Sequence, residues 1–299
     1  MRTLFFILLL LFPSSCAVGA QTIQERLGER TYLLHLPPGY REKAALPLMF
    51  CLHGGGGTAR GIERSTGFSK LADREGFLVV YPDGADRHWN DGREDGPGQG
   101  HDDVDFIRRL LDHLKASYPI DPGRVYATGP SNGGMMSQRL GAELSDRFVA
   151  IAPVIGGISE PVARAFHPAR PVSVLILQGT ADPWVPYVGG DVEVRPGVSR
   201  GRIIATEKAV SLWVTHNGCK PQPVSQSLPD TDPSDGCNAE LRRYPDGREG
   251  TEVILVRLLG AGHTWPGGSQ YLPEGMIGKV CRDLDGASYI WSFFKSHSR

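Results

Sequence analysis

Residues 126–136 read YATGPSNGGMM, and this stretch decides the fold of the chain. Arg124–Thr128, which overlaps its start, is mostly apolar and predicts a buried strand, while the residues after Gly133 predict a helix. The Gly-x-Ser-x-Gly pattern between them centres on Ser131 and is typical of a nucleophile elbow, a sharp turn that presents a serine hydroxyl for attack. Its glycines let strand and helix approach while the serine holds a strained backbone. The alternative for Ser131 is an ordinary helix N-cap.

The same pattern occurs a second time, at residues 197–201 (GVSRG). This copy follows Pro196, and no apolar run leads into it as one leads into the first copy. We therefore predict a loop for residues 197–201 and take Ser131 as the candidate nucleophile.

The rest of the chain alternates between expected strands and expected helices. Apolar runs and weak alternation predict strands at Arg30–Leu36, Pro47–Leu52, Phe77–Tyr81, Val149–Ile155, Val172–Gln178 and Glu252–Leu258. Helices are expected at Asp102–Tyr118, Thr206–Asn217 and Ala287–Lys295, and an irregular segment at Lys220–Asn238. This alternation is typical of an α/β fold, a mostly parallel sheet with helices on both faces. In such sheets ligands bind beyond the carboxyl ends of the strands.

A general base and its acidic partner are expected where later strands end. His263 follows the last expected strand in a glycine-rich loop, and Asp182 follows an earlier strand within a short turn. The order Ser131, Asp182, His263 is the order of α/β-hydrolase triads. In such a triad the histidine takes the serine proton, and the aspartate fixes the histidine tautomer. The alternatives are a polar surface histidine and an ordinary Asp-Pro turn.

Backbone amides are the expected donors to the oxyanion of the tetrahedral intermediate. One is the N–H of Asn132, directly after the candidate nucleophile, and another comes from the glycine run after the strand that ends near Leu52. In that run Gly55 is the first choice and Gly54 the second. Three loop tryptophans are candidate substrate walls, with packing of the loops onto the body as the equal alternative: Trp89, Trp184 and Trp265.

Length and composition fit one enzyme-sized domain. The 299 residues are 40% hydrophobic, enough for a large core, and we expect residues 21–299 to form a single catalytic domain. The formal net charge is −1, and no basic run with interleaved aromatics occurs. Nucleic acid and anionic membrane surfaces are therefore not expected partners. The oligomeric state stays open.

The pattern of the first 20 residues predicts that they form a signal peptide. Leu4–Phe12 is an apolar run too short to span a bilayer, and small residues at 18–20 offer a cleavage point before Gln21. We therefore expect a secreted or periplasmic protein with no transmembrane segment in the mature chain. Lipid anchoring through Cys16 is the less favoured alternative, because Pro13 stands where a lipoprotein box has leucine.

Four cysteines remain after such cleavage: Cys51, Cys219, Cys237 and Cys281. An oxidising compartment permits disulfides, and Cys219 and Cys237 bracket one polar loop, so we expect these two to pair. Cys51 lies in an apolar strand and is expected to be simply buried. No Cys-x-x-Cys with metal spacing occurs, and we expect neither a metal site nor a cofactor.

Several separate motifs then fall in a familiar order. They are LHGGGG at 52–57, YPDG at 81–84, WNDG at 89–92, GPSNGGMM at 129–136, GTAD at 179–182, VPY at 185–187, NGC at 217–219 and GHTWPG at 262–267. From about Arg30 to the C-terminus the chain resembles the polyhydroxybutyrate depolymerase / feruloyl esterase family of α/β-hydrolases. The resemblance implies a triad of Ser131, Asp182 and His263, in exported esterases that act on polyesters, feruloylated xylan or acetylated sugars.

Two departures from the family pattern bear on the substrate. We expect no appended linker and substrate-binding domain, which argues against crystalline polymer as the substrate. Pro130 fills an elbow position where relatives often have another small or apolar residue. We expect an exported serine esterase for polyester oligomers such as those of 3-hydroxybutyrate. The alternative is a feruloyl or acetylxylan esterase of plant cell-wall polysaccharide. A serine peptidase or a non-catalytic binding protein on the same fold is less favoured.

Overall fold

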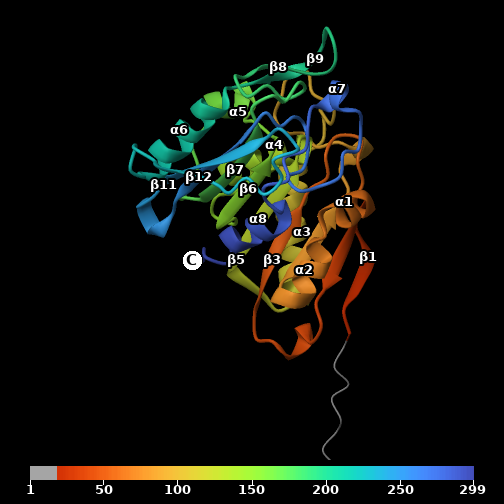
Figure 1. The fold of residues 1–299 in the computed structure, drawn as a ribbon. Coiled ribbons are helices and arrows are strands. Elements are labelled where there is room, and N and C mark those ends of the chain that lie inside the picture. The colour runs from red at the N-terminus through yellow and green to blue at the C-terminus, as the bar shows by residue number, and fades with distance from the viewer. Residues whose placement is uncertain (1–18) are drawn as a thin grey trace, which may run out of the picture.

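The computed structural model describes residues 19–299 (Figure 1), so Cys16 and nearly all of the expected signal peptide lie outside the described residues. A ten-stranded sheet forms its centre. From one edge to the other, its strands are β1 (Gln21–Leu27), β2 (Arg30–Leu36), β4 (Leu78–Pro82), β3 (Leu46–Cys51), β5 (Ile120–Pro130), β6 (Ala150–Val154), β7 (Ser173–Gly179), β12 (Val253–Leu259), β11 (Asn238–Tyr244) and β10 (Val224–Ser227). The six central strands are mutually parallel, and antiparallel pairs extend both edges.

Helices cover both faces of this sheet. Their bounds are α1 (Ala59–Thr66), α2 (Phe68–Glu75), α3 (Asp103–Ser117), α4 (Asn132–Glu143), α5 (Glu160–Arg164), α6 (Thr206–Asn217), α7 (Glu274–Ile277) and α8 (Gly286–Phe294). Successive side chains of β3 point to opposite faces, so Leu48 and Phe50 join the core under α3, α4 and α6. Met49 and Cys51 join the other core, under α1, α2 and α8. The predicted α/β architecture is confirmed.

A separate two-stranded hairpin stands at the top of the molecule in Figure 1, beyond the central sheet. It consists of β8 (Gly190–Arg195) and β9 (Val198–Ile203), which pair antiparallel. The prediction of a loop at residues 197–201 was therefore wrong. A left-handed glycine turn at Gly197, with φ of 72°, reverses the chain into β9. Ser199 is used in the hairpin itself, where its hydroxyl donates to the Asp191 carboxylate at 2.7 Å.

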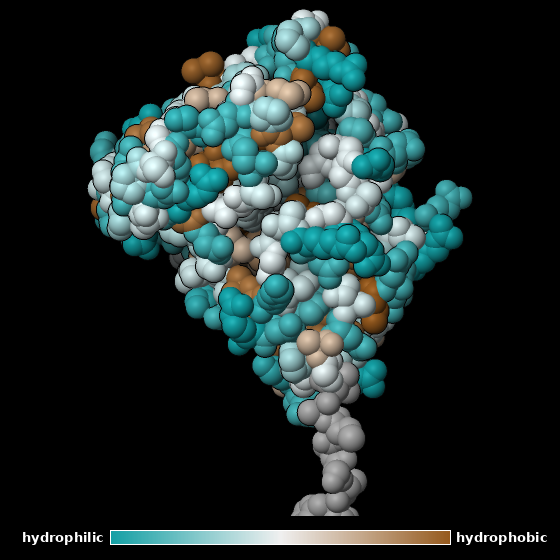
Figure 2. All heavy atoms as spheres, turned by 45° about the vertical axis from the view of Figure 1, so that its right-hand side comes forward, coloured by the Kyte–Doolittle hydropathy of each residue, from teal (hydrophilic) through white to brown (hydrophobic). Residues whose placement is uncertain are grey.

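The surface carries no large continuous apolar patch on the face drawn in Figure 2, where hydrophobic residues form small groups among hydrophilic ones. Among the described residues, no helix is long and apolar enough to cross a membrane.

The expected disulfide between Cys219 and Cys237 is absent: all four cysteines of the described chain are free thiols. Cys219, which follows α6, packs in the core on one face of the sheet. Cys237 precedes β11 and packs in the core on the opposite face. Since a disulfide needs Cβ atoms about 4 Å apart, the sheet between these two residues excludes the pair.

We predict that the native protein reacts slowly with a thiol reagent such as Ellman's reagent at neutral pH. Burial raises the pKa of Cys219 and Cys237 to about 11 and that of Cys281 to about 12, and it raises that of Cys51 beyond the usual range. Few reactive thiolates are therefore present. After denaturation without reductant, all four thiols should react. Only two reactive thiols would mean that one disulfide forms after all.

Candidate active site

Ser131 lies in a sharp turn between β5 and α4. Its backbone angles, φ 55° and ψ −122°, fall outside the regions that L-residues favour. A Cβ placed on Gly129 or Gly133 would lie 2.2 or 2.3 Å from the carbonyl oxygen of Leu52, so both positions require glycine. Ser131 stands at the N-cap position of α4, yet its side chain makes no capping hydrogen bond. The hydroxyl is thus left uncommitted to the helix end.

Asp182 and His263 form a buried pair. His263 Nδ1 lies 2.8 Å from Asp182 Oδ2, and both side chains are almost wholly shielded from solvent. The other carboxylate oxygen of Asp182 accepts the backbone N–H groups of Trp184 and Val185, each at 2.9 Å. These two donors fix the carboxylate, because it cannot turn away from His263 without losing them. Asp182 follows β7 and His263 follows β12, its neighbour in the sheet, as the strand-end rule requires.

The glycine run after β3 packs against the elbow. A Cβ on Gly54 would lie 3.7 Å from the Ser131 Cβ, and one on Gly55 would lie 3.7 Å from the Asn132 Cβ. Gly56 and Gly57 already donate their amides within the protein, to the carbonyls of Arg87 and Gly54. The Gly55 amide has no acceptor within residues 19–299, so it is free to face a ligand.

His53 holds this glycine run in place. It is buried, its Nδ1 lies 2.8 Å from the Gly54 carbonyl, and its Nε2 accepts the Gly84 N–H at 2.9 Å. A ring that donates at Nδ1 and accepts at Nε2 is neutral. Burial is the main cause that lowers the pKa of His53.

This lowered pKa predicts a stability change in mild acid. The unfolded chain, where His53 titrates near 6.5, takes up the proton before the folded chain does. Stability is therefore full above about pH 6.5 and is lost as pH falls through that value toward the lower folded pKa. We expect His53→Gln to show a shallower loss of unfolding free energy between pH 6.5 and 5 in urea titrations. Identical slopes would contradict the assignment.

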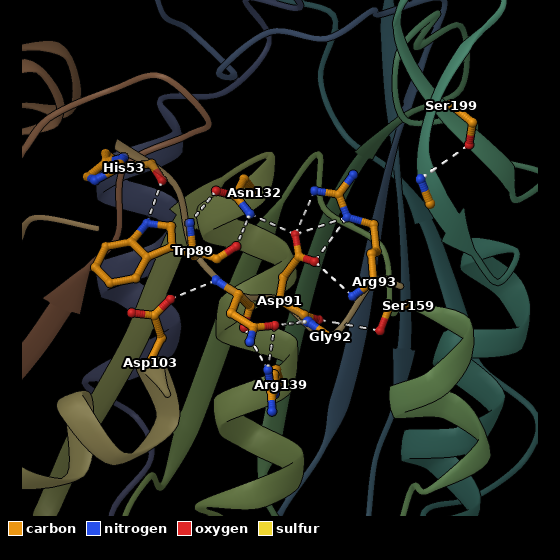
Figure 3. Close-up of polar contacts among 12 residues, drawn as sticks. His53, Trp89, Asp91, Gly92, Arg93, Asp103, Asn132, Arg139, Ser159 and Ser199 are labelled. Carbon is orange, nitrogen blue, oxygen red and sulfur yellow. Dashed lines mark hydrogen bonds and ion pairs between the residues drawn. The ribbon is translucent and has the colours of Figure 1, made fainter. Parts of the chain in front are cut away.

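A side-chain network ties Asn132 to the loop that follows β4 (Figure 3). Asn132 Oδ1 accepts the Trp89 N–H at 2.8 Å, and its Nδ2 donates to the Trp89 carbonyl at 2.9 Å and to Asp91 at 2.7 Å. The Trp89 indole N–H donates in turn to the His53 carbonyl at 2.9 Å. Asp91 also binds Arg93 through both carboxylate oxygens. Asp91 and Arg93 were not among the predicted site residues, although the WNDG motif contains the first of them.

The predicted site residues surround one cavity of about 640 Å³. Ser131, His263, Asn132 and Gly55 all line it, while Asp182 lies behind His263. Two of the predicted tryptophans, Trp184 and Trp265, also line the cavity. Trp89 does not, which corrects the prediction that it forms a substrate wall. Trp89 is 0% exposed because its side chain packs in the core, where the indole N–H donates to the His53 carbonyl, while the backbone N–H of Trp89 donates to Asn132.

The cavity can support nucleophilic acyl transfer. It opens onto a serine hydroxyl, a histidine with a buried carboxylate behind it, and free backbone amide hydrogens. Within the described residues, no group of three or more His, Cys, Asp or Glu is arranged to hold a metal ion.

The comparisons with known proteins agree with this arrangement. The model of the family described as "Esterase PHB depolymerase" matches residues 30–223. NocK of Nocardia uniformis subsp. tsuyamanensis, which carries a provisional esterase name, is 32% identical over 88% of this chain and 78% of its own length. Feruloyl esterase B of Piromyces equi is 30% identical over 78% of this chain, but the match spans only 42% of that protein.

Solved structures show the same fold at low identity. Acetyl xylan esterase from Aspergillus awamori matches with a TM-score of 0.58 and 16% identity, over 83% of this chain and 94% of its own. The feruloyl esterase module from Clostridium thermocellum matches with a TM-score of 0.53 and 14% identity, over 83% of each chain. These likenesses establish the α/β-hydrolase fold. Because the family model covers well over half of the 299 residues, the chain belongs to the PHB depolymerase family of esterases.

Proposed function

We propose that this protein is an exported serine carboxylic-ester hydrolase that cleaves polyester oligomers such as those of 3-hydroxybutyrate. Residues 21–299 would form its single catalytic domain, after removal of residues 1–20 as a signal peptide. One observation carries the catalytic part of the proposal. The buried Asp182–His263 pair and the strained Ser131 turn meet at one cavity.

The proposed reaction proceeds through an acyl-enzyme. Ser131 Oγ attacks the ester carbonyl carbon while His263 Nε2 takes the hydroxyl proton, and the C=O electron pair moves onto the oxygen. The N–H groups of Asn132 and Gly55 bind that oxyanion. When the C–O bond breaks, the alcohol leaves with the proton from His263. Water then repeats the sequence: His263 accepts its proton, the acid is released, and Ser131 is regenerated.

Asp182 keeps His263 in the reactive form during both halves of the reaction. With its Nδ1–H directed at the carboxylate, the ring presents an unprotonated Nε2 to the nucleophile. The negative charge of Asp182 also stabilises the imidazolium that forms when the proton moves. The backbone donors of Trp184 and Val185 hold the carboxylate ready, so no rearrangement is needed at the moment of transfer.

A second candidate is a feruloyl or acetylxylan esterase. The observation that favours it is the pair of tryptophans in the cavity wall, Trp184 and Trp265, since an indole face suits the ring of a ferulate or the face of a sugar. The relatives named above as feruloyl and acetyl xylan esterases agree with this alternative.

The proposal is tested by assaying purified protein on methyl ferulate, p-nitrophenyl acetate, p-nitrophenyl butyrate and a soluble 3-hydroxybutyrate oligomer. A fluorophosphonate probe, with peptide mapping, should label Ser131 in parallel. Preference for the oligomer supports polyester breakdown, and preference for ferulate supports the alternative. Hydrolysis of none, with Ser131 unlabelled, would overturn both in favour of a binding protein. Faster cleavage of an amide than of its matching ester would point to a peptidase.

A further inference from the structure

Within the described part of the chain, Arg93 carries a buried guanidinium nitrogen that has no hydrogen-bond partner. Its side chain is 3% exposed, Nε donates to Asp91 at 3.0 Å, and Nη2 donates to Asp91 at 2.8 Å (Figure 3). The third nitrogen, Nη1, is buried and has no hydrogen-bond partner in the described chain. In folded proteins nearly all buried hydrogen-bond donors have an acceptor. A buried donor on a charged group that lacks one costs folding free energy. A bound group would satisfy it.

Arg93 lines the same cavity as Ser131 and His263. The Asp91 carboxylate that holds Arg93 also accepts the side-chain amide of Asn132, at 2.7 Å. The guanidinium is therefore fixed through one intermediate residue to the position beside the nucleophile. A ligand that fills this cavity would therefore contact Arg93 and Ser131 at the same time.

A second arginine, far from Arg93 in the sequence, also lines the cavity. Arg200 comes from β9 of the hairpin. The hairpin packs directly on Arg93, since a Cβ on Gly201 would lie 2.8 Å from the Arg93 Cβ. Arg200 has no ion pair or side-chain hydrogen bond within residues 19–299. Because Asp91 neutralises Arg93, Arg200 supplies the net positive charge at this end of the cavity.

No aspartate or glutamate lines the cavity among the described residues. Two carboxylates that lie close behind its lining are engaged within the protein: Asp91 with Arg93 and Asn132, and Asp182 with His263. A cavity with an unpartnered guanidinium nitrogen, a second arginine and no lining acid is complementary to an anion.

We propose that this end of the cavity is a carboxylate subsite, in which Arg93 Nη1 and Arg200 bind a carboxylate carried by the ester substrate. The inference rests on the proposed esterase function and narrows it to acidic esters. Two sources share this chemistry. The carboxylate can belong to the leaving alcohol, as in a hydroxyacid oligomer with a free acid end, or to the acyl part, as in a half-ester of a dicarboxylic acid. Charge-assisted hydrogen bonds to a guanidinium would fix either one.

The test compares acidic esters with neutral amides of nearly the same shape. One pair is the 3-hydroxybutyrate dimer and its terminal primary amide, and the other is monoethyl succinate and ethyl succinamate. Each pair contains the same single ester bond. We expect kcat/KM to favour the acid in at least one pair by about tenfold or more, as for one charge-assisted hydrogen bond. The pair that shows the preference identifies whether the carboxylate lies on the alcohol or the acyl side.

Two variants link the preference to the arginines. Arg200→Gln removes the positive charge that the hairpin contributes to the cavity wall, and Arg93→Lys keeps a cation beside Asp91 but loses the fork that presents Nη1. Each should lower the acid-to-amide ratio of kcat/KM by about tenfold. Arg195→Gln, at an exposed position of the same hairpin, is the matched control and should leave the ratio unchanged. Indirect damage through Asp91 and Asn132 would lower both members of a pair equally.

A ratio near one in the unmodified protein, or a ratio that neither variant changes, would overturn the subsite. Failure of the esterase proposal looks different: all esters would resist, and the fluorophosphonate would not label Ser131. In that case calorimetry with free 3-hydroxybutyrate and Ser131→Ala still decides the subsite, because binding needs no turnover. Saturable binding that Arg200→Gln weakens by about tenfold supports it, and no saturable binding contradicts it.

Discussion

Ser131→Ala is expected to lower kcat on p-nitrophenyl butyrate by about 10⁶-fold, the loss seen when the nucleophile of a Ser-His-Asp triad is removed. The reason is that Ser131 supplies the hydroxyl at the tip of the elbow turn, in the cavity that His263 also lines. Residual turnover would come from the amides proposed to bind the oxyanion and from substrate binding. Initial rates over a wide range of enzyme concentration measure the loss.

The control for this result is the second Gly-x-Ser-x-Gly serine. Ser199 lies on the hairpin, and its hydroxyl is hydrogen-bonded to Asp191, so Ser199→Ala should retain nearly full activity. Circular dichroism should show Ser131→Ala folded. Activity within tenfold of the unmodified protein in Ser131→Ala would show that another residue performs the attack.

Asp182→Asn is expected to lower kcat by roughly 10⁴-fold while leaving the fold intact. The amide oxygen can still accept the N–H groups of Trp184 and Val185, which holds the side chain in its present orientation. Its NH₂ group then faces Nδ1 of His263 and donates to it. The ring must carry its proton on Nε2 instead, where it cannot accept the proton of Ser131.

Two further variants test whether the loss in Asp182→Asn comes from the role of Asp182 in the triad. Asp283→Asn removes another mostly buried carboxylate, one that accepts the Thr231 N–H and does not line the cavity, and should cost stability but little kcat. The double variant Ser131→Ala/Asp182→Asn should be no slower than Ser131→Ala alone, because the residues act as one unit. A multiplicative loss in the double variant would contradict that shared role.

The sequence predicted the elements whose own pattern determines them. Thr206–Asn217 was expected as a helix ending at Gly218, and α6 has these bounds with Gly218 in the left-handed conformation. The buried runs before Asp182 and His263 became β7 and β12. These segments carry enough apolar residues at one period for local pattern and tertiary burial to agree.

The features that the sequence did not predict depend on distant partners. The strands β8 and β9 are short and mostly polar, so their pairing is visible only once they lie across the cavity. Cys219 and Cys237 are near in sequence, but the faces on which they pack are set by the strands and helices around them. The bond between Asp91 and Asn132 joins residues 41 positions apart, and no local pattern encodes it.

The hairpin β8–β9 has a consequence for how this enzyme can change. It supplies Val192, Val194 and Arg200 to the cavity wall, yet it belongs to a sheet of its own and contributes no strand to the ten-stranded one. The residues proposed for bond cleavage instead follow strands of the ten-stranded sheet, namely β5, β7 and β12. Substitutions at its cavity-lining positions, Val192, Val194 and Arg200, can therefore alter which molecules fit, while the proposed triad residues keep their own supporting strands. Evolution, or a laboratory library confined to those residues, can explore new substrates from a scaffold that stays folded and reactive.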